Sequence, residues 1–250
     1  MPTVRDIYNY INTLAPFETQ EEWDNSGLLI GSFDKEVKRA VLSLDATKAV
    51  CTLAADYGAD LVVSHHPIIF SPLSEIIEGS AVYTCANNSV SVISAHTNFD
   101  KAEQGINANL CKILGINNVE PIENTFIVRG SLECEMSIDD FAQLVADRLG
   151  TAGIRYTETD NPIKTVAVGG GACEEYINDA MQCADCFLTG DMKYHSMLNA
   201  AEQGFAVISA GHFETESEAF SRLLDMLKAE FPEVEFVWGN QQNPVKTFDF

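Results

Sequence analysis

The sequence predicts an α/β fold of two similar lobes, each a mostly parallel sheet covered by helices. Short apolar runs alternate with amphipathic segments along most of the 250 residues. This alternation is typical of parallel sheets, because parallel strands are joined by crossover connections that are usually helical. Several features also recur in the same order in the two halves of the chain, which indicates an internal duplication.

Strands are expected at short apolar runs, and helices where apolar residues recur every three or four positions. Thr47 and Ser137 occupy N-cap positions, and Gly58, Gly115 and Gly150 follow expected helices, which supports the helix boundaries. The expected strands cover residues 40–44, 61–64, 90–94, 126–130, 165–168, 186–188, 206–209 and 234–238. The expected helices cover residues 4–14, 48–57, 106–114, 138–149, 174–182, 193–203 and 216–230.

The duplication rests on positions that match between the two halves. The matched pairs are Val41 with Val166, Asp60 with Asp185, residues 92–95 with 207–210, and His96–Asp100 with His212–Glu216. The first two pairs are separated by 125 positions, and the last two by 115 and 116. We therefore expect a first lobe of residues 1–125, a second lobe of residues 126–250 and a metal site between the lobes.

Composition narrows the class of protein. Hydrophobic residues make up 46% of the chain, which is typical of a globular protein. Lys and Arg number 15 against 37 Asp and Glu, and the formal net charge of −22 argues against nucleic-acid binding. Because the sequence shows no long apolar run and no signal peptide at its start, we expect a cytoplasmic protein that does not bind membranes.

The seven cysteines are an odd number, scattered over expected helices and strands, which suits reduced thiols. For the lone pair Cys183 and Cys186, ordinary packing is favoured and a redox role stays open. Gly169–Gly171 follows an expected strand and precedes an expected helix, so it is either a phosphate-binding turn or a tight turn.

All five histidines lie just after expected strands. Because ligands collect at the carboxyl ends of strands in open α/β sheets, these side chains are expected to face one crevice. The set is His65, His66, His96, His195 and His212. For His65 and His66 alone, structural imidazoles at a strand end are an alternative; Pro67, which follows them, ends any strand there.

His212 and Glu216 are four residues apart at the entry of an amphipathic helix, so both side chains lie on one helix face. Asp100 is the matching carboxylate of the first lobe. The alternative for one lobe is that the negative charge of Glu216 only complements the dipole at the helix N-terminus. This alternative does not explain why a histidine and a carboxylate four residues apart recur in both lobes.

Three imidazoles and two carboxylates are too many ligands for one tetrahedral zinc and suit two bridged ions. The expected ligands are His65, His66, Asp100, His212 and Glu216. Zinc, iron, manganese, cobalt and nickel all fit these nitrogen and oxygen donors. Asp191 and His195 are expected to orient a metal-bound imidazole or the substrate, and His96, Asp191 and His195 are candidates for proton transfer.

Six ordered motifs resemble those of a known family and span most of the chain. They are Glu22–Gly27, Leu44–Thr47, Ser64–Pro67, His96–Asp100, Thr189–His195 and Gly211–Glu216. In these residues the chain resembles the Nif-three-like proteins, which are also called type 2 GTP cyclohydrolase I homologues.

The resemblance implies a duplicated α/β fold, a ring-shaped homohexamer and dinuclear metal sites that face the central cavity. It places the family's ligands on the five residues named above, with Glu216 bridging the ions and His96, Asp191 and His195 lining the site. A chain of this length resembles the short form, which has no domain inserted between the lobes.

Two functions from different classes are expected. The first is a metal-dependent hydrolase that acts on a nucleotide or a related phosphorylated small molecule, with Glu216, His96, Asp191 and His195 as catalytic residues. The alternative is a metal-binding ring that acts as a scaffold or a regulatory partner without chemistry of its own.

Overall fold

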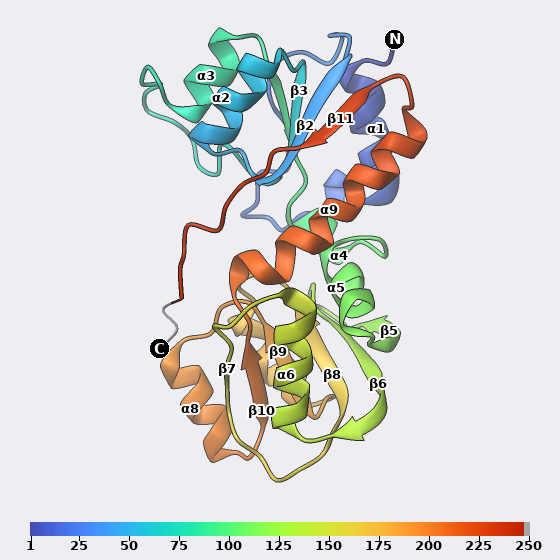
Figure 1. The fold of residues 1–250 in the computed structure, drawn as a ribbon, viewed down its shortest axis with the longest axis vertical. Helices are drawn as coiled ribbons and strands as arrows, with labels where there is room; N and C mark the ends of the chain where they lie inside the picture. The colour runs from blue at the N-terminus through green and yellow to red at the C-terminus, as the bar shows by residue number, and fades with distance from the viewer. Residues whose placement is uncertain (248–250) are drawn as a thin grey trace. The chain divides into compact units, whose positions relative to one another are not determined.

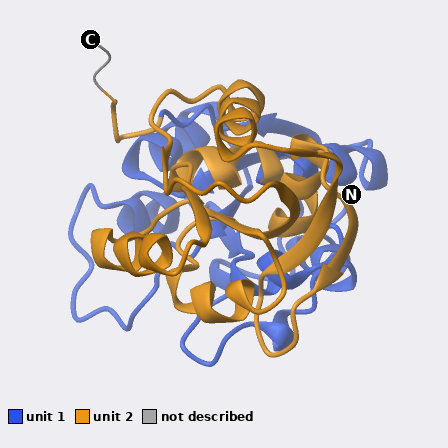
Figure 2. Cartoon of the chain, turned by 90° about the horizontal axis from the view of Figure 1, so that it is seen from below, with its two compact units in different colours: residues 1–104, 220–242 blue, residues 105–219, 243–250 orange. Residues whose placement is uncertain are grey.

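The computed structural model describes residues 1–247, which form two compact units (Figures 1 and 2). The first unit consists of residues 1–104 and 220–242, and the second of residues 105–219 and 243–247. This division differs from the expected lobes of residues 1–125 and 126–250. The difference arises because β11, near the end of the chain, pairs with β2 in the sheet of the first unit.

The first unit contains a five-stranded sheet in the order β1-β4-β3-β2-β11. Only β1 is antiparallel to its neighbour; the other pairings are parallel. Helices α2 and α3 lie on one face of this sheet and α1 lies on the other (Figure 1). The elements are α1 (Val4–Leu14), η1 (Phe17–Thr19), β1 (Gly27–Ile30), β2 (Arg39–Asp45), α2 (Lys48–Tyr57), β3 (Leu61–His66), α3 (Ala81–Asn87), β4 (Ser91–Ser94), α4 (Thr97–Lys101) and β11 (Glu235–Trp238).

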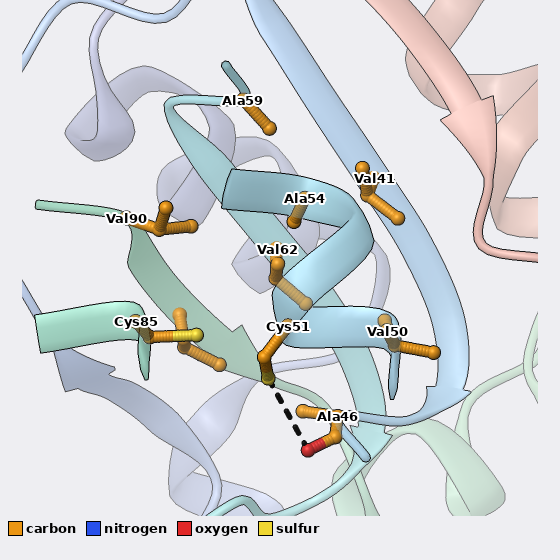
Figure 3. Packing of buried hydrophobic residues seen from close by; sticks show 10 residues of the cluster. Val41, Ala46, Val50, Cys51, Ala54, Ala59, Val62, Cys85 and Val90 are labelled. Atoms are coloured by element: carbon orange, nitrogen blue, oxygen red, sulfur yellow. Dashed lines mark hydrogen bonds between the residues drawn. The ribbon is translucent and has the colours of Figure 1, made fainter. Parts of the chain in front are cut away.

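Helix α2 is held on the sheet by small apolar side chains. Cys51 and Ala54 of this helix belong to one cluster with Val41 of β2 and Val62 of β3, and all four are fully buried (Figure 3). Burial of a valine side chain contributes about 1.5–3 kcal/mol, so Val41 and Val62 both help to hold this helix on the sheet. The buried strands carry apolar residues on both faces, as expected for a sheet covered on both sides.

The second unit contains a six-stranded sheet in the order β5-β6-β8-β9-β10-β7. Helices α7 and α8 pack on one face through Ala180 and Ala200. The elements are α5 (Ile106–Leu114), β5 (Asn117–Pro121), β6 (Val128–Met136), α6 (Ile138–Leu149), β7 (Arg155–Tyr156), β8 (Ile163–Gly169), η2 (Glu174–Tyr176), α7 (Ile177–Met181), β9 (Cys186–Thr189), α8 (Tyr194–Glu202) and β10 (Ala206–Ser209). Helix α9 (His212–Glu230) is divided: residues 212–219 belong to this unit and residues 220–230 to the first.

The sheet of the second unit is parallel only at its centre. Strands β8, β9 and β10 are parallel, whereas β5, β6 and β7 join the sheet through antiparallel pairings. The connection of β5 to β6 covers only residues 122–127, which is too short for a parallel crossover and produces a hairpin. The expected mostly parallel sheet therefore describes the first unit better than the second.

The two sheets share an arrangement that agrees with an internal duplication. Three parallel strands, β2-β3-β4 or β8-β9-β10, are followed in each sheet by one antiparallel edge strand, β1 or β7. The matched residues Asp60 and Asp185 also make the same contacts. Asp60 accepts from the N–H groups of residues 38 and 39, and Asp185 from those of residues 164 and 165.

The described bounds match the expected helices 4–14, 48–57, 106–114 and 138–149, where caps and periodicity agree. Helix α9 begins at His212 instead of residue 216, and the expected helix 174–182 is split into η2 and α7. Strands β1, β5 and β7 and helices α3 and α4 were not expected. These elements are short, and β1, β5 and β7 lie at sheet edges, so they lack a long apolar pattern.

The contacts of Asp185 generate a prediction about stability. Its Oδ2 accepts from the hydroxyl of Thr165 at 2.6 Å and from the N–H groups of Thr165 and Lys164 at 2.7 and 3.1 Å. Burial raises the pKa of Asp185, but these hydrogen bonds outweigh burial and hold the pKa below its ordinary value. The carboxylate therefore stabilises the fold above the unfolded-state pKa of about 4, and this contribution is lost as the pH falls through the folded-state pKa.

Asp185→Asn is expected to lower the free energy of unfolding by about 1 kcal/mol near pH 7, a small value because solvent screens this exposed group. Urea unfolding monitored by circular dichroism at several pH values measures the effect. Asp160→Asn, which removes the same charge from an exposed bend, serves as the control. Equal effects of the two substitutions at every pH would show that the Asp185 contacts do not stabilise the fold.

Candidate metal centre

His65 and His66 are the last residues of β3. The His65 side chain is fully buried, and its Nδ1 lies 2.8 Å from the carbonyl oxygen of Ala95. Because a carbonyl oxygen only accepts, Nδ1 carries the proton and Nε2 carries the lone pair. His66 makes the corresponding bond from Nδ1 to Asp45 Oδ1, also at 2.8 Å. The ring centroids of His65 and His66 are 4.8 Å apart, so these neighbouring residues can contribute to one site at the end of the strand.

His96 precedes the first residue of α4 and is bonded to a buried acid that the sequence did not indicate. Its Nδ1 lies 2.8 Å from Oδ1 of Asp24, whose side chain is inaccessible to solvent. Asp24 Oδ2 also accepts from the N–H and the hydroxyl of Thr97. Burial raises the pKa of Asp24, but the hydrogen bonds from His96 and Thr97 outweigh it and hold this pKa well below its ordinary value. Asp24 therefore stays ionised and fixes the His96 ring.

The first unit brings four of the predicted site residues together. His65, His66 and His96 each offer a ligand atom, and these atoms lie within 4.8 Å of one another. Asp100, in α4, is almost completely buried, and its Oδ1 lies 3.6 Å from Nε2 of His65. This group of nitrogen and oxygen donors can hold a metal ion.

The second unit brings three further predicted residues together at the start of α9. His212 Nδ1 lies 2.8 Å from Asp191 Oδ2, and His212 Nε2 lies 3.2 Å from Glu216 Oε2. The spacing of four residues places both side chains on one helix face. The Glu216 side chain is only 4% exposed, so a carboxylate is held in a nearly dry position, where a cation would stabilise it.

Gly171 allows the backbone to approach Glu216 closely. Its φ is +65°, and a Cβ at this position would collide with the Glu216 carboxylate. The N–H groups of Gly170 and Gly171 donate to Asn107 and Thr215, so they are not directed at a ligand. The glycine run therefore forms a tight turn beside Glu216, and the alternative of a phosphate-binding turn is not supported.

His195 lies exposed in the first turn of α8, with its ring centroid 5.4 Å from that of Tyr194. Its part in the site stays a prediction. Of the cysteine pair, Cys186 is fully buried in β9, and Cys183 is half-buried, with its thiol near the carbonyl oxygen of Asp179. Burial raises the pKa of Cys186, which suits a packed thiol better than a reactive one.

Four imidazoles share one feature that prepares them for a metal ion. Each directs Nδ1 to an acceptor and leaves Nε2 with the lone pair that a divalent ion binds. The four pairs are His65 with Ala95, His66 with Asp45, His96 with Asp24, and His212 with Asp191. The donor chemistry therefore fits the divalent metals that the sequence analysis named.

Sequence reasoning placed Asp24 and Asp45 in two of the family-like motifs, Glu22–Gly27 and Leu44–Thr47, but gave neither residue a role at the site. Asp45 could have been found, because it ends β2 and lies opposite His66 in the parallel register. Asp24 is 72 positions from His96 and lies outside the regular elements, so no pattern predicts their contact.

These features define an α/β protein with two sheets and with histidine and carboxylate groups after its parallel strands. The model of the DUF34/NIF3 family, described as NGG1p interacting factor 3, matches residues 2–244. The chain belongs to this family.

Curated relatives and solved structures match this chain over nearly its full length. A Clostridium perfringens protein named GTP cyclohydrolase 1 type 2 homolog is 30% identical over 248 residues, which cover 94% of this chain and 95% of the relative. A Campylobacter jejuni protein of the same name is 32% identical, and the match covers 97% of this chain and 98% of the relative. The structure of reduced HcgD from Methanocaldococcus jannaschii is 26% identical, with a TM-score of 0.85 and coverage of 96% and 98%.

A Staphylococcus aureus hypothetical protein has a TM-score of 0.92 and 25% identity, with coverage of 99% and 100%. The α/β fold with two sheets is therefore shared along essentially the whole chain. Within the described residues, no helix has the length and apolar character needed to cross a membrane.

The close approach of Gly171 to Glu216 generates a prediction. Gly171→Ala is expected to displace the Glu216 carboxylate and to weaken metal retention at least tenfold, as changes beside metal ligands do. The matched control is Gly204→Ala, because Gly204 has a similar φ of +69° but a Cβ there would meet no atom within 4 Å. Metal content after dialysis against graded chelator measures the effect. Equal retention by the two variants would contradict a role for Gly171 at the site.

Proposed function

We propose that this chain is a divalent-metal-dependent hydrolase that acts on a nucleotide or a related phosphorylated small molecule. The main support is the set of imidazoles of His65, His66 and His212, whose Nδ1 atoms are held in hydrogen bonds and whose Nε2 atoms keep the lone pair that a divalent ion binds. A Helicobacter pylori relative named GTP cyclohydrolase 1 type 2, 32% identical over 86% of this chain, supports a nucleotide substrate.

We assign two ions to five ligands: His65, His66, Asp100, His212 and Glu216. The family's motifs support this joint assignment, because the five residues stand at the positions where the resemblance places the family's ligands.

The acidic composition supports this choice of substrate site. A chain with a net charge of −22 repels phosphate over most of its surface, so a phosphorylated substrate needs a local cation. Bound divalent ions would supply that charge and would lower the pKa of a water molecule for attack. Asp45 and Asp191 hold the imidazoles of His66 and His212 in the orientation that such binding requires.

Among the proposed groups for proton transfer, His96 has the strongest support. Asp24 stays ionised beside it and fixes the orientation of the ring through Nδ1, as a buried acid does when it orients a catalytic imidazole. Glu216, Asp191 and His195 complete the proposed catalytic set. The proposed location is the cytoplasm, as the sequence analysis expected, and the proposed assembly is a homohexameric ring, which rests on the family resemblance.

The second candidate is a metal-binding scaffold or regulatory protein without chemistry. One observation favours it: the loop after β3 exposes three large aliphatic side chains, Leu73, Ile76 and Ile77. Exposed apolar residues that cluster in one loop are typical of surfaces that bind other proteins.

His65→Ala tests the ligand assignment. Protein purified without an affinity tag for metals is expected to contain about two metal equivalents per chain by elemental mass spectrometry, as a two-ion site requires. His65→Ala is expected to lose them, because the buried Nε2 donor is removed. His195→Ala is the control and is expected to keep them. Equal metal content in the wild type and His65→Ala would contradict the assignment.

Glu216→Gln separates the two candidate functions. A hydrolase is expected to lose its turnover of nucleotides in this variant, measured by phosphate release and chromatography at saturating metal. His96→Ala is expected to retain metal and to turn over about 10²–10⁴-fold more slowly, as loss of a proton-transfer group implies. Full turnover in Glu216→Gln would exclude the proposed role of Glu216. A metal-loaded wild type that converts no nucleotide would favour the scaffold.

A further inference from the structure

Two exposed aromatic rings lie beside the histidines of the first unit. Trp23 is 53% exposed and Phe70 is 51% exposed, although both are large and apolar. Their ring centroids are 5.9 Å apart, and each ring makes an edge contact with His96, at 5.9 and 6.1 Å. Exposed aromatic rings grouped in one place are a common feature of binding sites.

Hydrogen bonds hold the two aromatic segments together. The side-chain amide of Asn25 donates to the carbonyl oxygen of Ile69 at 2.6 Å, which joins the segment of Trp23 to that of Phe70. Asp24 is bonded to Thr97, and the hydroxyl of Thr97 also accepts from the N–H of Glu21. The backbone on both sides of Trp23 is therefore fixed, which keeps the segments that carry the two rings close together before any ligand arrives.

The two rings are continuous with the candidate metal ligands. The His96 ring, which both of them contact, lies 5.1 Å from that of His65 and 5.4 Å from that of His66. A ligand that rests on Trp23 and Phe70 would therefore place its attached groups near the Nε2 donors of this cluster.

We propose that Trp23 and Phe70 form a stacking platform for a planar heteroaromatic ring of the substrate. The inference rests on the proposed function and narrows it: the substrate carries an unsaturated ring joined to a phosphate, as in a nucleotide, and is not a simple sugar phosphate. Stacking on aromatic side chains is tolerant of the ring's identity because every base has a π-face. The platform therefore selects for the presence of a ring, and the metal-binding cluster selects for the anionic group.

Trp23 fluorescence tests the platform directly. The chain has two tryptophans, so Trp238→Phe leaves Trp23 as the only tryptophan, which is excited at a wavelength that the tyrosines do not absorb. Metal-loaded protein is titrated with guanosine monophosphate and with ribose 5-phosphate, which differ only by the base. We expect the nucleotide to quench Trp23 and to bind at least tenfold more tightly than the sugar phosphate. Phe70→Ala in this background is expected to remove most of that difference, because the base loses one of the rings on which it stacks.

The matched control is Tyr156→Ala, which removes an exposed aromatic ring from β7 in the second unit. It is expected to leave nucleotide binding unchanged. The inference is overturned if ribose 5-phosphate binds as tightly as the nucleotide, or if neither changes the emission of Trp23. It is also overturned if the emission responds to protein concentration alone, which would show that a second copy of the chain covers the rings.

The binding readout separates this inference from the proposed hydrolase. Selective quenching by the nucleotide without any turnover would support the stacking platform and contradict the proposed hydrolase function. If phosphorylated compounds with and without an aromatic ring were turned over with equal efficiency, the hydrolase function would be supported and the stacking platform would be contradicted. Metal content of Phe70→Ala equal to that of the wild type shows that the substitution leaves the metal site intact.

Discussion

The candidate metal centre depends on hydrogen bonds that end at the Nδ1 atoms of four imidazoles. The acceptors are a backbone carbonyl for His65 and the carboxylates of Asp45, Asp24 and Asp191 for His66, His96 and His212. Each bond fixes the proton on Nδ1 and the orientation of the ring, so the lone pair of Nε2 is available in a defined direction. A buried imidazole such as His65 would otherwise be costly to keep, because a polar group removed from water must have a partner.

The sheets supply these partners at neighbouring strand ends. Asp45 lies opposite His66 where β2 and β3 end, and Asp191 and His212 follow the adjacent parallel strands β9 and β10. Carboxyl ends of parallel strands meet at one edge, which is why this fold collects functional groups there. Gly171 adopts a left-handed backbone conformation that other residues rarely adopt, and this conformation lets the chain pass close to Glu216.

The sequence predicted what depends on local pattern and missed what depends on distant contacts. The bounds of α1 and α2 were predicted correctly, because a capping threonine and periodic apolar residues define them. The pairs of histidine and carboxylate four residues apart were visible because they recur. Asp24 was given no role because its partner is 72 positions away. The grouping of Trp23 and Phe70 beside His96 depends on contacts between separate segments, so no local pattern indicates it. The unit boundaries also could not be predicted, because the pairing of β11 with β2 joins opposite ends of the chain.

Anomalous X-ray diffraction from crystals of the metal-loaded protein tests the central claim most directly. Data collected above and below the absorption edge of the metal that copurifies locate the ions without assumptions about their ligands. The account predicts two anomalous peaks roughly 3.5–4 Å apart, with Nε2 atoms of His65, His66 and His212 among the ligands. A single peak, or peaks bound by other residues while these Nε2 atoms contact only protein or water, would contradict it.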